Sequence, residues 1–202
     1  MFTGLIEEVG RLASAEPTGR GLRLSIAAEK VVDGMQPGDS ISLDGVCQTV
    51  VALTDRGFAV EAMAPTLSRT TLGGLQPNQR LNLERAMTLA TRLGGHLVQG
   101  HVDGVGTVQA VQGAGEHVLL DIEMPEVVAE VTVLHGSIAV NGVSLTVNEL
   151  LSEKVLQVAI IPHTWEHTNF SGLQPGSTVN LEGDMIGKFV VEYMKRRGSH
   201  AV

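Results

Sequence analysis

The chain repeats itself once, and this duplication constrains the fold more than any other feature of the sequence. The stretch from Gly38 to Val50 returns as Gly136 to Val147, with Gly45 and Gly142 97 positions apart. The stretch from Thr66 to Glu84 returns 98 positions later. A period near a hundred residues is too long for a solenoid or propeller and matches a domain that folds alone. We therefore expect two copies of one small domain, at residues 1–88 and 97–184.

The residue pattern of each copy indicates β-structure. Asn141-Gly142 stands between two alternating runs, Ser137–Val140 and Ser144–Val147, as does Asp44-Gly45 in the first copy. These dipeptides favour tight hairpin turns. Short strands with turns at regular spacing favour a barrel or a sandwich over βαβ units. We expect an all-β chain of two small β-barrels, joined by a linker or helical turn near residues 87–93.

The end of the chain follows a different pattern. Five apolar residues recur at helical spacing and define what we call the apolar stripe: Ile186, Phe189, Val190, Tyr193 and Met194. Asp184 is placed to cap this helix, which we expect over residues 185–199. The stripe needs a partner surface, either on the chain's own barrels or on another subunit.

Composition excludes several classes of protein. The sequence has 14 basic and 22 acidic residues, a formal net charge of −8, which argues against nucleic-acid binding. Its single cysteine, Cys47, cannot form an internal disulfide, so we expect a reducing compartment. The longest uncharged stretch, 131–148, is broken by Gly, Ser and Asn and alternates like a strand, so no membrane span is expected.

Two pairs of polar strand residues are the first candidates for chemistry. Cys47 and Thr49 share one side of a predicted strand, and Ser144 and Thr146 do so at the equivalent place in the second copy. They line two related pockets or are ordinary strand residues. His101 stands between Gly100 and Val102, in a glycine-rich run that permits close approach of a ligand or of backbone.

The sequence predicts no metal site. His163 and His167 have the four-residue spacing of a helical zinc site, but the neighbouring Pro162 and threonines favour extended chain. No third ligand is evident.

Four motifs together resemble the riboflavin synthase alpha-chain family: Met1–Glu7, Gly94–Gly104, Asn141–Val147 and Ile161–Thr164. The resemblance runs in order along nearly the whole chain. It implies two six-stranded Greek-key barrels, with a C-terminal helix that helps to form a homotrimer. It also implies a cytoplasmic transferase for the last step of riboflavin biosynthesis, possible association with lumazine synthase, and no metal or redox cofactor.

The implied reaction is a dismutation of two molecules of 6,7-dimethyl-8-ribityllumazine. One gives a four-carbon unit to the other, yielding riboflavin and 5-amino-6-(D-ribitylamino)uracil. Cys47, Ser40 or a bound water could add to the ring at C7, with His101 carrying protons near neutral pH. The sequence does not decide between these nucleophiles.

The resemblance also implies a set of substrate contacts. The first-barrel pocket would use Ser40 and His101 together with Gly4, Leu5, Ile6, Cys47, Gln48, Thr49, Glu61, Ala62 and Met63, and we include the flanking Gly100 and Val102. The second would use Ser144, Leu145, Thr146, Ile161, Pro162, His163 and Thr164, with His135 and Asp184 as further candidates.

Three positions depart from the family pattern. Gln48 stands where the family often has Leu, Pro65 where it has Glu, and His135 where it has Lys. Two alternatives to the enzyme therefore stay open: a non-catalytic lumazine- or flavin-binding relative, such as an optical antenna protein, and a β-barrel interaction module without a small ligand. Pairs of polar residues at matching positions favour the enzyme.

Overall fold

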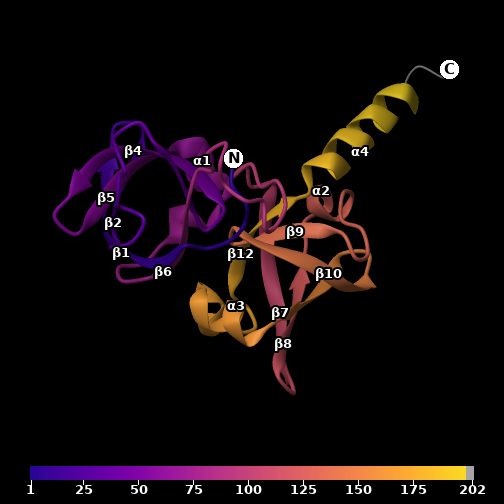
Figure 1. Ribbon diagram of the computed structural model, residues 1–202. Helices are drawn as coiled ribbons and strands as arrows, with labels where there is room; N and C mark the ends of the chain where they lie inside the picture. Colours follow the sequence, from indigo (N-terminus) through magenta and orange to yellow (C-terminus); the bar gives the residue numbers. More distant parts are fainter. Residues whose placement is uncertain (199–202) are drawn as a thin grey trace.

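The computed structural model describes residues 1–198 and shows two closed, antiparallel six-stranded barrels followed by a helix (Figure 1). The first barrel has the sheet order β1 (Glu8–Thr18), β2 (Gly21–Ala27), β5 (Gly57–Met63), β4 (Val46–Thr54), β3 (Ser40–Leu43) and β6 (Arg80–Arg85). The second has the order β7 (Gly104–Ala114), β8 (His117–Glu123), β11 (Val155–Ile160), β10 (Val143–Ser152), β9 (Ser137–Val140) and β12 (Thr178–Gly183). The order is the same in both, which confirms the duplicated all-β fold.

The two predicted hairpin turns form at Asp44-Gly45 and Asn141-Gly142. All four residues have positive φ, between 44° and 80°. This is the backbone of a two-residue turn that matches the twist of the flanking strands, and Asn, Asp and Gly adopt it most readily. The turns join β3 to β4 and β9 to β10.

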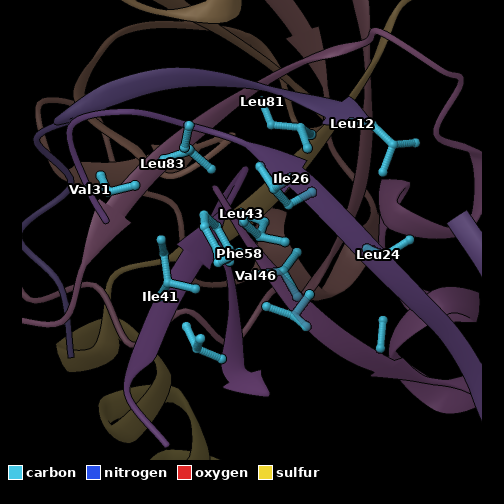
Figure 2. Close-up of a cluster of buried hydrophobic side chains, with 14 of the residues drawn as sticks. Leu12, Leu24, Ile26, Val31, Ile41, Leu43, Val46, Phe58, Leu81 and Leu83 are labelled. Atoms are coloured by element: carbon cyan, nitrogen blue, oxygen red, sulfur yellow. The ribbon is translucent and has the colours of Figure 1, made fainter. Parts of the chain in front are cut away.

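Inward-facing residues of each barrel build a separate apolar core. Figure 2 shows the first of these, in which Ile26, Leu43 and Phe58 come together from β2, β3 and β5 and are buried. The second core has the same plan and contains Phe170, again fully buried. Each barrel therefore supplies its own hydrophobic stabilisation.

Short helices interrupt the path into the last strand of each barrel. They are α1 (Ala64–Arg69) and η1 (Thr71–Gly74) before β6, and α3 (Pro162–His167) and η2 (Asn169–Gly172) before β12. The expectation of extended chain around Pro162 is wrong, because proline is tolerated in the first helical turn, where a missing N–H costs nothing. A further turn, α2 (Glu126–Ala129), follows β8.

The helix α4 (Met185–Gly198) projects away from both barrels at the end of the chain (Figure 1). The Asp184 carboxylate accepts a hydrogen bond from the Ile186 N–H, as predicted for a cap. The apolar stripe is exposed along its whole length, at 55% to 68% of each side chain. Residue 199 of the predicted helix lies outside the described residues. Residues 87–93 form turns and no helix. Within residues 1–198, no helix has the length and apolar character needed to cross a bilayer.

Candidate functional site

The segments that lead into the two barrels lie against each other. Phe2 and Val98 form an antiparallel bridge in which the Phe2 N–H donates to the Val98 carbonyl at 2.7 Å and the Val98 N–H donates back at 3.1 Å. Both side chains are buried and pack with Ala139 and Cys47. The amino-terminal residues are thereby held between the two barrels, although Phe2 and Val98 are 96 positions apart in the sequence.

Each leading segment crosses to the opposite barrel. The Ser144 N–H donates to the Gly4 carbonyl, and the Cys47 N–H donates to the Gly100 carbonyl, both at 2.8 Å. Ile6 packs against the core of the second barrel. Gly4 and Ile6, which were predicted for the first-barrel pocket, therefore contact the second barrel. Leu5, predicted with them, lines a cavity beside Ser40 of the first barrel.

Val102 shows the same crossing for the segment that leads into the second barrel. It follows Gly100 and His101 and packs against the core of the first barrel. The segment 100–102 thus joins Cys47, although it precedes the second barrel in the sequence. Gly4 and Gly100 occupy equivalent positions in the two copies of the sequence, but this equivalence does not determine which barrel each one contacts.

Glycine is required at both crossings. A Cβ on Gly4 would lie 2.5 Å from the Ser144 Cβ, and a Cβ on Gly100 would lie 2.6 Å from the Cys47 Cβ. Both glycines also have a positive φ, 76° and 80°. Only glycine permits this approach of backbone to strand. The main chain is therefore in direct contact with the two strand positions that the sequence marked for chemistry.

Two buried glutamates fix the crossings. Glu84 accepts hydrogen bonds from the Thr3 N–H at 2.6 Å and the Gly4 N–H at 3.0 Å. Its counterpart Glu182 accepts from the N–H groups of Gln99 at 2.7 Å and His101 at 2.8 Å. Burial raises the pKa of both carboxyls, against the opposing effect of these donors. Each carboxyl acts as an anchor for one leading segment.

The predicted polar pairs face outward. Val46 and Val50 are buried in the first core, whereas Cys47 is half-buried and Thr49 exposed. Ser144 is half-buried and Thr146 exposed on the equivalent strand. Each pair therefore sits on the outer surface of its barrel, beside the segment that crosses from the other barrel.

Several other predicted contacts point into the barrels. Gln48 is buried, with its Nε2 donating to the Cys47 carbonyl at 2.8 Å. Ala62 is buried in the first core, and Leu145 packs against the second. The side chains of these three residues stabilise the barrels, which leaves mainly their backbone for contact with a ligand.

The ends of β5 and β11 approach the outward pairs. Val50 lies opposite Val60 in the first barrel, and Val147 lies opposite Val158 in the second. The antiparallel register carries the ends of these strands toward the starts of β4 and β10. The predicted contacts at the end of β5 and just after β11 are exposed or half-buried: Glu61, Met63, Ile161, Pro162, His163 and Thr164.

Ser40 is the first residue of β3. It is opposite Thr49 in the strand register and lines a cavity of about 650 Å³ together with Thr3, Leu5 and the start of the linker. The lining of this cavity includes neither Cys47 nor His101. His101 itself is exposed. In a single chain, Thr49 and His101 are therefore open to solvent, whereas Cys47 is half-buried.

His96 is a further candidate site residue, beyond those predicted from the sequence. Its Nδ1 lies 2.7 Å from the Ser144 Oγ, in a partly buried hydrogen bond. Burial lowers the pKa of His96, and the nearby Asp184 charge opposes this shift. The signal was present, since His96 stands in the same Gly94–Gly104 motif as His101. The first barrel has Cys47 where the second has this Ser144–His96 pair.

The departures from the family pattern have simple local explanations. Pro65 lies in the first turn of α1, where no backbone donor is needed. His135 is exposed, with φ of 62°, and its N–H donates to the Val147 carbonyl at 3.0 Å. It therefore lies at the rim of the second barrel, near the outward-facing Thr146.

Comparison with known proteins agrees with this arrangement. The lumazine binding domain model matches residues 3–86 and again residues 99–184. The riboflavin synthase of Bacillus amyloliquefaciens is 41% identical over 196 residues, 97% of this chain and 91% of that protein. That of Mycobacterium tuberculosis (strain H37Rv) is 44% identical over 201 residues, 98% of this chain and all of that protein.

Solved structures show the same fold. The crystal structure of LumP complexed with riboflavin superposes with a TM-score of 0.84 and 23% identity, over 91% of this chain and 99% of that one. LumP complexed with 6,7-dimethyl-8-(1'-D-ribityl) lumazine gives 0.82 at the same identity and coverage. The lumazine binding domain model matches the chain twice, and the riboflavin synthases are 41% to 44% identical to it over nearly its whole length. The chain therefore belongs to the riboflavin synthase family.

Proposed function

We propose that this protein is a riboflavin synthase that converts two molecules of 6,7-dimethyl-8-ribityllumazine into riboflavin and 5-amino-6-(D-ribitylamino)uracil. A four-carbon unit passes from one molecule to the other, so the enzyme is a transferase and needs no external oxidant. The observation that carries the proposal is the identity of 41% to 44% with riboflavin synthases over at least 97% of this chain.

The duplicated architecture suits a reaction between two identical substrates. Each barrel presents an outward polar pair beside a leading segment from the other barrel, so one chain holds two related sites. Holding two reactants in a fixed mutual orientation turns a bimolecular encounter into a reaction within one complex, which can contribute about 7–11 kcal/mol to lowering the barrier. Positioning is therefore the main task of the protein.

We assign residues to the two proposed sites from the exchange of segments. The first consists of Cys47 and Thr49 with the segment 100–102, and the second of Ser144 and Thr146 with the segment 4–6. The strand ends complete them, through Glu61–Met63 in the first and Ile161–Thr164 in the second. His135 and Asp184 lie at the second site. The barrels comprise residues 1–88 and 97–184.

The chemistry of the two sites differs. The first has a thiol, Cys47, with His101 next to the glycine that contacts it; the second has Ser144 hydrogen-bonded to His96. Addition of a nucleophile at C7 of one ring and loss of a proton from the methyl group at C7 of the other are the steps these groups serve. Cys47, Ser40 or a water supplies the nucleophile, and a histidine carries the proton.

The open first site supports an assembly in which a neighbouring subunit completes it. We propose a homotrimer in which α4, at residues 185–199, contributes its apolar stripe to the contact. With a single unpaired cysteine, the protein fits the reducing cytoplasm. Association with lumazine synthase, which would supply the substrate directly, is the one partner protein we propose.

The proposal is tested by incubating the protein with the lumazine alone and following riboflavin fluorescence. Formation of riboflavin and the ribitylaminouracil in equal amounts is the expected result. Tight binding of lumazine without turnover would favour a lumazine- or flavin-binding relative. Absence of both would favour an interaction module and overturn the proposal.

A further inference from the structure

His163 and His167 lie on a helix, contrary to the sequence-based expectation of extended chain. Both belong to α3, Pro162–His167, and are separated by one helical turn. Residues four apart on a helix share a face, so the two imidazoles are neighbours. Their ring centroids are 4.2 Å apart with an angle of 13° between the ring planes. Both side chains are exposed.

The hydrogen bond of His167 fixes which of its nitrogens carries a lone pair. The Nδ1 lies 2.8 Å from the His163 carbonyl oxygen. A carbonyl oxygen only accepts, so this Nδ1 must be the protonated nitrogen. In the neutral ring the Nε2 is then unprotonated and points away from the backbone. Metal-binding histidines commonly donate their second N–H to a backbone carbonyl in this way, which orients the ring and raises its basicity.

We propose that His163 and His167 form a two-histidine site for a divalent transition-metal ion, of the class of Zn²⁺, Ni²⁺ and Cu²⁺. Imidazole nitrogen is a preferred ligand for these ions and a poor one for Mg²⁺ or Ca²⁺. The ring centroids are only 4.2 Å apart, and rotation about the side-chain bonds of two residues four apart on a helix can turn both rings toward one ion. The formal net charge of −8 also favours cations near the surface.

The site is exchangeable and does not hold the fold together. No group of three or more His, Cys, Asp or Glu side chains within residues 1–198 is placed to hold a metal ion. Water therefore fills the remaining coordination positions, unlike the four protein ligands of a structural zinc site. Such an ion binds and leaves without unfolding the protein.

Metal binding here would inhibit the enzyme, an inference that rests on the proposed function. His163 belongs to the segment Ile161–Thr164, which we assign to the second lumazine site. An ion on His163 and His167 would lie, with its bound waters, directly beside that segment and would restrain the His163 side chain. Mg²⁺ and Ca²⁺ would leave turnover unchanged, because they do not bind imidazole pairs.

The experiment is a calorimetric titration of the full chain with Zn²⁺ and, separately, Ni²⁺, on wild type, His167→Gln and His163→Gln. His117→Gln is the matched control, since His117 is an exposed histidine in another part of the second barrel. We expect each ion to bind at one site per chain in wild type and in the control. Loss of a residue that only hydrogen-bonds to a metal ligand weakens metal affinity by roughly 10- to 100-fold. Loss of one of the two ligands themselves should weaken binding by at least as much. Equal binding in wild type and His167→Gln would overturn the proposal.

A parallel turnover assay separates this inference from the proposed function. Inhibition of wild type by Zn²⁺ that disappears in His167→Gln supports the placement of the ion at the second lumazine site. Zinc binding that leaves turnover unchanged would overturn that placement but not the metal site. A protein that binds zinc and lacks turnover in metal-free buffer would count against the proposed function alone.

Discussion

Asp44 in the first barrel makes the contact that Asn141 makes in the second. The Asp44 Oδ1 accepts a hydrogen bond from the Asn82 N–H at 2.7 Å, and the Asn141 Oδ1 accepts from the Asn180 N–H at 2.8 Å. The barrels are then linked reciprocally, because the side-chain Nδ2 of each strand asparagine donates to the turn carbonyl of the other barrel. The duplication has thus produced an interface with approximate twofold symmetry, broken by one carboxyl group.

Replacing Asp44 with Asn should remove a pH dependence from stability. Burial raises the pKa of Asp44 from 3.8 to about 8, so the folded protein keeps a proton that the unfolded chain loses above pH 4. Stability from this group is therefore full below pH 4 and falls as the pH rises toward 8, with a slope of at most about 1.4 kcal/mol per pH unit. Denaturant unfolding of wild type and Asp44→Asn between pH 5 and 9 measures the difference.

The reciprocal variant is the control. Asn141→Asp places a second carboxyl at the equivalent position and should steepen the loss of stability over the same pH range. The structure itself shows that asparagine fits this turn, since Asn141 has nearly the same φ as Asp44, 44° against 46°. A pH profile unchanged in Asp44→Asn would show that Asp44 does not titrate in this range.

Gly100→Ala should damage the first site far more than an alanine at another glycine of positive φ. The added Cβ would lie 2.6 Å from the Cys47 Cβ and 2.8 Å from the Phe2 ring. Gly176 has φ of 91° with no neighbour within 4 Å, so Gly176→Ala carries the backbone strain alone. Strain of this kind costs about 1–2 kcal/mol, and overpacking typically adds about 1–3 kcal/mol. Equal thermal unfolding of the two variants would contradict the close crossing at Cys47.

The duplication, the hairpins and the terminal helix could be predicted because each depends on local chemistry. Asn141-Gly142 favours a two-residue hairpin turn, and the apolar stripe has the period of an α-helix. The exchange of Gly4 and Gly100 between barrels could not be predicted, since it is decided by long-range packing of Ile6 and Val102. The helix that begins at Pro162 was not predicted, because the proline indicated extended chain. Proline is disfavoured in the interior of a helix but tolerated in its first turn, where Pro162 lies.

Cys47→Ser should abolish most turnover while leaving the fold intact. The variant gives the first barrel the hydroxyl that Ser144 provides in the second, with little change in size. Because Cys47 is half-buried and on the outer face, the core is not disturbed. Steady-state rates, with circular dichroism as a check of folding, measure the effect. Turnover close to that of wild type would assign Cys47 to packing and leave Ser40 or water as the nucleophile.

His101→Gln should slow turnover and flatten its pH dependence near neutrality. The side chain is exposed and adjacent to Gly100, while its backbone N–H stays bound to Glu182 in the variant. Glutamine preserves polarity but cannot carry a proton at this pH. Rates measured from pH 5.5 to 8.5 decide the matter. An unchanged profile would assign the proton transfer to another group.

His96→Gln tests the second site through both stability and rate. Burial lowers the pKa of His96, so the unfolded chain binds a proton more readily near pH 6.5. The stability from this residue is therefore present above pH 6.5 and is lost as the pH falls, and His96→Gln should lack that loss. The variant also removes the ring Nδ1 that lies 2.7 Å from the Ser144 Oγ. Loss of a hydrogen bond worth about 1 kcal/mol corresponds to a several-fold lower rate, and we expect an effect of that order. Wild-type kinetics in the variant would exclude a role for the Ser144–His96 pair in turnover.

Phe189→Asp should weaken the proposed trimer and make activity depend on protein concentration. Phe189 is 68% exposed in the single chain and lies in the middle of the apolar stripe, so an aspartate there costs little within one subunit but opposes burial against another. A point variant is preferable to removal of α4, which would also delete Lys188 and its ion pair with Asp103 at 2.6 Å. Glu192→Ala, on the polar side of the same helix, is the control. Mass measurement in solution, with activity assayed across a dilution series, gives the answer by mass action. A Phe189→Asp protein with the mass of wild type would move the subunit contact away from the stripe, and a wild-type monomer with full activity would defeat the shared site.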